Sequence, residues 1–126
     1  MIFQTMFGPF KAASMTFGDD VLMKYSKEAP EAVAAGVKII ADALEEWTKG
    51  YLEAGADGIY YSAQFGEIGR FEKNEWEELV RPYDLQILKV AEEMPEKYNI
   101  LHICGEPEYQ FETHVEWFKN YPAEFD

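Results

Sequence analysis

The sequence predicts an α/β fold made of parallel strand–helix units. Three observations predict it: short apolar runs alternate with long amphipathic segments, the runs are almost continuously apolar, and glycine marks their ends. Strands of a parallel sheet are nearly all apolar because helices cover them. Such units form either an open, doubly wound sheet or a (β/α)8 barrel, which typically needs about 250 residues. A chain of 126 residues can therefore supply about half of a barrel.

The first strand–helix unit is expected over residues 2–55. Residues 2–7 are rich in β-branched and aromatic side chains, and Gly8 and Pro9 end this expected strand. A long helix begins at Pro30, since proline is favoured in a first helical turn, and it ends at Gly55. Steps of three and four predict its buried stripe, which consists of Val33, Val37, Ile40, Leu44, Trp47 and Tyr51.

Two further units follow. Residues 58–64 are expected to form the second strand, and Asn74 with a glutamate three residues later resembles the start of a capped helix. Pro82 lies inside that helix and should kink it or break it in two. Residues 99–104 form the third expected strand, and a last helix begins at Thr113. The expected buried face of the second helix contains Trp76, Val80, Tyr83, Ile87 and Met94.

Composition sets limits on the class of protein. Residues 1–126 are expected to form a single partial barrel domain of about three βα units with the start of a fourth. The net charge of −13 should repel nucleic acids and anionic lipids, and no run approaches the length of a membrane span. Cys104 is the single cysteine, so no internal disulfide can form and a cytoplasmic location is expected.

His102 and Cys104 are the strongest candidates for chemistry. One residue separates them on an expected strand, so their side chains share a face, roughly 6.5 to 7 Å apart. Imidazole and thiolate are ligands that zinc accepts, and His114 or a carboxylate would have to complete the site. The alternative is a buried thiol beside a hydrogen-bonded core histidine. Both residues lie at the carboxyl end of a strand, where parallel α/β folds place their active sites.

Gln64 holds the matching position at the end of the second expected strand. Its amide both donates and accepts hydrogen bonds, so it is a candidate catalytic residue that orients a substrate. The alternative is an ordinary polar residue at a strand-to-loop junction. The loop at 65–69 lacks the lysine and hydroxyl residues of a phosphate-binding loop, so no nucleotide site is expected.

Three strings of residues resemble the uroporphyrinogen decarboxylase superfamily. They are EAGADGIYYSAQ at 53–64, ELVRPYDLQIL at 78–88 and NILHICG at 99–105. Residues 3–18 are similar to a strand of that family and its loop with a Gly/Ala-Pro pair. Members of this superfamily are (β/α)8 barrels considerably longer than this chain. The resemblance therefore implies the central part of such a barrel.

The superfamily includes decarboxylases of uroporphyrinogen and zinc-dependent enzymes that transfer methyl groups from corrinoid proteins to thiols such as coenzyme M. Met15 and Gln64 stand where decarboxylases carry a tyrosine and a serine, and few arginines remain to hold a substrate with eight carboxylates. The methyltransferase branch has a His-x-Cys pair, which His102 and Cys104 match, and its third zinc ligand would fall beyond Asp126.

The resemblance thus implies a zinc-dependent methyltransferase that uses a corrinoid on a partner protein and a small thiol as acceptor. These residues alone are expected to be inactive, because the remaining loops of the barrel would be missing. The alternatives are uroporphyrinogen decarboxylase proper and a non-catalytic small α/β protein. In each case the open edges of the sheet favour a homo-oligomer.

Overall fold

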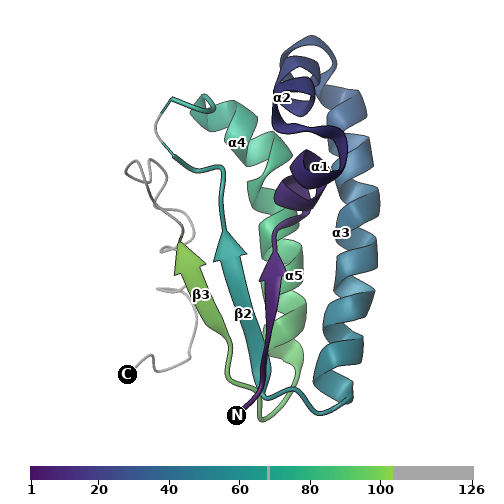
Figure 1. Ribbon diagram of the computed structural model, residues 1–126, viewed down its shortest axis with the longest axis vertical. Helices are drawn as coiled ribbons and strands as arrows, with labels where there is room; N and C mark the ends of the chain where they lie inside the picture. The colour runs from purple at the N-terminus through teal and green to yellow at the C-terminus, as the bar shows by residue number, and fades with distance from the viewer. Residues whose placement is uncertain (68, 104–126) are drawn as a thin grey trace.

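The computed structural model describes residues 1–67 and 69–103 (Figure 1). Within these ranges the chain forms a parallel sheet of three strands and five helices, which confirms the predicted α/β class. No helix in this part of the chain has both the length and the hydropathy needed to cross a bilayer. The elements are β1 (Phe3–Phe7), α1 (Pro9–Phe17), α2 (Asp19–Glu28), α3 (Pro30–Glu53), β2 (Gly58–Ala63), α4 (Lys73–Leu79), α5 (Arg81–Glu93) and β3 (Ile100–Ile103).

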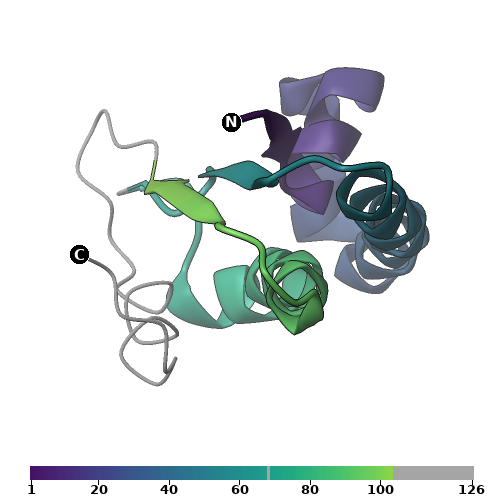
Figure 2. The same ribbon diagram turned by 90° about the horizontal axis from the view of Figure 1, so that it is seen from below.

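The strands lie in the order β1-β2-β3, and the long helices α3 and α5 cover the same face of the sheet (Figure 2). Met6, Tyr61 and Ala63 point to that face and are buried with residues of both helices. On the other face, Thr5, Phe7 and His102 are exposed. Sequential parallel strands with helices on one side only are the arrangement of a barrel wall, in which the open face points inward.

The predicted helix at Pro30 is confirmed, but its buried stripe differs from the prediction. Val33 and Val37 are buried as expected, whereas Trp47 is 61% exposed and the neighbouring Thr48 is fully buried. Successive helical residues point about 100° apart, so the two side chains face different neighbours. Thr48 donates a hydrogen bond to the Leu44 carbonyl, which satisfies its hydroxyl within the helix.

Helices α1 and α2 were not predicted. Pro9 occupies the first turn of α1, and Gly18, with a φ of +90°, separates the two helices. Their buried sides include Ser14 and Ser26, so no continuous apolar stripe marks them in the sequence. Tertiary packing against α3 supplies the burial that the local pattern lacks.

The expected break at Pro82 is confirmed, because α4 ends at Leu79 and α5 begins at Arg81. The expected start of α4 at Asn74 was wrong. The capping box is formed by Glu72 and Glu75, and the Glu75 carboxylate accepts the backbone N–H of Glu72 at 2.8 Å. Glu72 is the extended residue that precedes the helix and caps it. Asn74 already lies within the helix and cannot cap it.

An ion pair between Lys27 and Glu75 joins α2 to α4, with Nζ–O distances of 2.5 and 2.6 Å. The hydrogen bond from Lys27, followed by that from the Glu72 backbone, lowers the pKa of Glu75 from its ordinary value of 4.5. Because the folded-state pKa is the lower one, this contribution is present above pH 4.5 and is lost as the pH falls through the lowered value.

We therefore expect acidification from pH 7 to below the lowered pKa of Glu75 to reduce the free energy of unfolding. The reduction should be larger for the unaltered chain than for a Glu75→Gln variant. The difference should be no more than about 1 kcal/mol in the free energy of unfolding, since the pair is partly exposed. Urea unfolding at both pH values measures it, with Glu78→Gln as a control at an exposed position of the same helix. The same pH dependence in the unaltered chain and Glu75→Gln would contradict the expectation.

Among the residues described, β1 pairs only with β2, so its other edge carries no strand. Trp47 and Met15 are exposed beside it and line a hollow of about 460 Å³ with residues of β1. The homo-oligomer expected from the open edges stays a prediction.

Candidate functional site

The three parallel strands end at the same edge of the sheet, and the segments that follow β1 and β2 form a polar hollow there. The hollow has a volume of about 290 Å³. In folds of this kind the loops after the strands carry the functional groups. We call it the polar hollow, and it is lined by Lys11, Ser14, Asp19, Gln64, Phe65, Glu67 and Arg70.

Gln64, the predicted catalytic residue, lies in this hollow directly after β2. Its side chain is half-buried, and its Nε2 atom donates to the Ser62 hydroxyl at 3.5 Å. This is a weak hydrogen bond, so the amide is available to a ligand. Its catalytic role stays a prediction.

Arg70 connects the segments that line the hollow. Its Nη1 atom lies 3.0 Å from each carboxylate oxygen of Asp19, and its Nε donates to Glu67. Ser14 adds a hydrogen bond to Asp19 at 3.2 Å. Burial alone would lower the pKa of the Arg70 guanidinium, but the hydrogen bonds to Asp19 and Glu67 outweigh it and raise this pKa. Arg70 therefore keeps its charge and holds α2 against the loop that follows β2.

Phe65 forms an apolar wall of the hollow. It is 4% exposed and has a φ of +70°, which is rare for an aromatic residue. Its ring packs edge-on against Phe10 at 5.0 Å, and the cations of Arg70 and Lys11 lie 4.6 and 5.7 Å from its centre. Burial and cation–π contacts hold the residue in this strained conformation.

His102 lies at the end of β3 on the open face of the sheet. Its ring stacks on Tyr60, with centres 5.6 Å apart and planes 24° apart. The imidazole is exposed and forms no hydrogen bond with another residue that the structure describes. The register places it beside Ser62, two residues before Gln64. His102 is therefore exposed at the open face and does not lie in the core formed by the described residues.

The predicted zinc ligands are only partly within the structure. Cys104 and His114 lie outside the described residues. Inside them, no three His, Cys, Asp or Glu side chains are grouped so that they could hold a metal ion. The exposed imidazole of His102 has the chemistry of one zinc ligand, because neither nitrogen is engaged by a described neighbour.

Tyr61 and Asp84 form a buried hydrogen-bonded pair next to Gly8, the residue that follows β1. The Tyr61 hydroxyl donates to the Asp84 carboxylate at 2.5 Å, and these residues are 0% and 2% exposed. A Cβ atom at Gly8 would lie 2.8 Å from the Tyr61 hydroxyl and overlap the Asp84 carboxylate. Glycine is therefore required where β1 turns into α1.

Sequence reasoning missed most of the polar hollow. Lys11, Asp19 and Arg70 received no role, because residues 9–28 showed no recognisable element and Arg70 lies in a loop. The available signal was position: these residues follow two expected strands, as Gln64 does. Which of them meet is decided by tertiary contacts such as that between Asp19 and Arg70.

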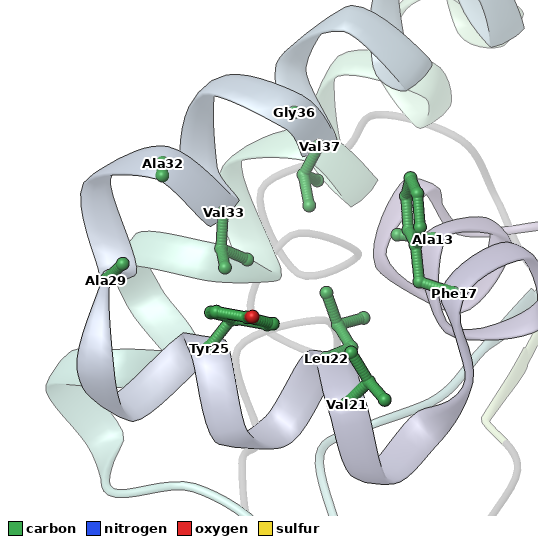
Figure 3. Close-up of a pocket in the computed structure, with 10 residues that line it drawn as sticks. All are labelled: Ala13, Phe17, Val21, Leu22, Tyr25, Ala29, Ala32, Val33, Gly36 and Val37. Atoms are coloured by element: carbon green, nitrogen blue, oxygen red, sulfur yellow. The ribbon is translucent and has the colours of Figure 1, made fainter.

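A third hollow is apolar and lies between α1, α2 and α3, with a volume of about 270 Å³ (Figure 3). Val33 and Val37 of α3 point towards Leu22 of α2, and Tyr25 lies alongside them. Tyr25 is the only polar side chain among its described lining residues, and none of them is charged, so this hollow offers no set of metal ligands and no ion-pairing group. The polar hollow and the end of β3 are therefore the better candidates for a site.

The fold and the site define the class: parallel βα units with polar groups at the carboxyl ends of the strands, as in βα-barrel proteins. Within that class, the chain belongs to the uroporphyrinogen decarboxylase family, since the family model described as Uroporphyrinogen decarboxylase (URO-D) matches residues 2–119. This confirms the predicted resemblance and the predicted partial (β/α)8 barrel. No match was found among the curated proteins or the solved structures.

Proposed function

We propose that these residues belong to a zinc-dependent methyltransferase, which moves a methyl group from a corrinoid protein to a thiol. The observation that carries the proposal is the exposed imidazole of His102 at the carboxyl end of β3, on the open face of the sheet. Cys104 follows it by two residues, and the amide of Gln64 lies at the end of the adjacent strand.

In this proposal His102 and Cys104 hold the zinc ion. When bound, zinc lowers the pKa of a thiol so that the substrate is a thiolate at neutral pH. The stacked ring of Tyr60 fixes the plane of the imidazole. Gln64 orients the substrate by hydrogen bonding, and the polar hollow binds the polar part of the substrate.

The surroundings of Arg70 and Met15 favour this proposal over a decarboxylase. Two carboxylates already neutralise Arg70, so it is poorly suited to hold a substrate rich in carboxylates. Met15 is 63% exposed and lines the hollow beside β1, not the polar hollow. It therefore places no polar group at the proposed site.

The test is methylation of 2-mercaptoethanesulfonate by methylcobalamin, measured with the longest natural protein that contains these residues. We expect His102→Ala and Cys104→Ser each to lower the rate about a hundredfold or more, because loss of a ligand removes the metal. Lys89→Met, at an exposed position of α5, is the control and should keep the rate.

Equal rates for Cys104→Ser and the unaltered protein would remove Cys104 from the mechanism. Turnover of uroporphyrinogen by the same preparation, with no thiol methylation, would establish the decarboxylase instead.

A further inference from the structure

The charges that line the polar hollow do not all find partners in it. Arg70 pairs with Asp19 and Glu67, so two carboxylates share one guanidinium. Both oxygens of Asp19 contact Arg70, whereas Oε2 of Glu67 accepts no hydrogen bond from another described residue. Among the described residues, the cluster of these three side chains therefore keeps one excess negative charge, and Oε2 of Glu67 remains open to a further donor.

Lys11 supplies the opposite charge in the same hollow. It contacts the Phe65 ring, and no carboxylate of the described residues lies within the 4.0 Å of an ion pair with it. Asp19 and Glu67 line the same hollow but remain beyond that distance. The hollow thus presents a separate ammonium donor and a separate carboxylate acceptor, with the Gln64 amide as a further polar group.

We propose that the polar hollow binds a small zwitterion of the α-amino acid type. Lys11 binds the ligand's carboxylate, Glu67 binds its ammonium group, and the ring of Phe65 contacts its carbon chain. A neutral or singly charged ligand leaves at least one of the two protein charges without a partner, which costs affinity. The volume of about 290 Å³ suits a molecule of this size.

Binding of the zwitterion does not depend on methyl transfer. Only its identification as the thiol acceptor, which would then be a thiol amino acid, rests on the proposed function. Ligands without a thiol therefore test the inference separately from the proposed function.

The experiment compares three matched ligands on the 126-residue chain. L-norvaline carries both charges, valerate lacks the ammonium group, and n-butylamine lacks the carboxylate. NMR titration gives each dissociation constant, and shifts of the Gln64 side-chain amide and the Arg70 Nε–H locate the ligand. We expect L-norvaline to bind about tenfold more tightly than either other ligand, which corresponds to one charge-assisted hydrogen bond.

Two variants assign the charges. Lys11→Met should remove the preference of L-norvaline over n-butylamine, and Glu67→Gln should remove its preference over valerate. Lys89→Met and Glu78→Gln are the matched controls at exposed positions, and both should keep the two preferences.

The comparison of ligands on the unaltered chain needs no variant, so an unfolded variant does not prevent the test. Equal affinity for L-norvaline and valerate would overturn the proposal in favour of a simple anion site. Shifts that spare Gln64 and Arg70, or no binding of L-norvaline, would overturn it as well.

Discussion

Replacing Gly58 by alanine should lower the free energy of unfolding by about 3 kcal/mol, the upper range for forcing atoms into a packed site. Gly58 begins β2, and a Cβ atom there would overlap the backbone carbonyl of Tyr98. That carbonyl belongs to backbone, which cannot turn aside as a flexible side chain would. Tyr98 is also fixed by a hydrogen bond from its N–H to the Asp57 carbonyl at 2.8 Å.

Urea unfolding measures the effect, and Gly50→Ala is the matched control. Gly50 lies inside α3, and apart from its two neighbours and the backbone of its own helix, no atom lies within 4 Å of the Cβ it would gain. Alanine there should leave the free energy of unfolding unchanged or raise it by up to about 1 kcal/mol, because alanine favours helix. A Gly58→Ala variant as stable as Gly50→Ala would show that β2 and Tyr98 do not approach as closely as described.

Replacing Tyr61 by phenylalanine should lower the free energy of unfolding by about 2 kcal/mol, within the range for removing one partner of a buried hydrogen bond. The change removes the hydroxyl that donates to Asp84, whose carboxylate is 2% exposed and has little water to replace it. Thermal or urea unfolding detects the loss.

Tyr60→Phe is the control for this change. Tyr60 is the preceding residue of the same strand, points to the opposite face, and forms no hydrogen bond through its hydroxyl to another described residue. It should remain within about 0.5 kcal/mol of the unaltered chain. If both variants unfold alike, the pair of Tyr61 and Asp84 contributes nothing specific to the β1 end.

The features of the fold that local pattern determines were predictable. The strand at 58–63, the helix from Pro30 and the break near Pro82 follow from apolar runs, a proline-started turn and a missing backbone donor. Helices α1 and α2 escaped prediction because their buried faces contain serines. The prediction for Trp47 was wrong because the helical period favours burial of this bulky apolar side chain, whereas the packing of α3 buries the neighbouring Thr48.

The candidate site was predictable only where a strand end alone identifies a residue. Gln64 and His102 were found in this way, because the carboxyl ends of parallel strands meet at one edge. The set formed by Asp19, Glu67 and Arg70 could not be predicted from the sequence, because Asp19 and Arg70 are 51 residues apart. Lys11 is a candidate only because it forms no ion pair with the described carboxylates. No sequence pattern reports that fact.

Zinc content tests the central claim most directly, that His102 and Cys104 are metal ligands. The longest natural protein containing these residues, and its His102→Ala/Cys104→Ala variant, are dialysed extensively without chelator and examined by elemental analysis. The account predicts about one zinc ion per chain in the unaltered protein and almost none in the variant. Equal zinc in both proteins, or none in the unaltered one, would contradict it.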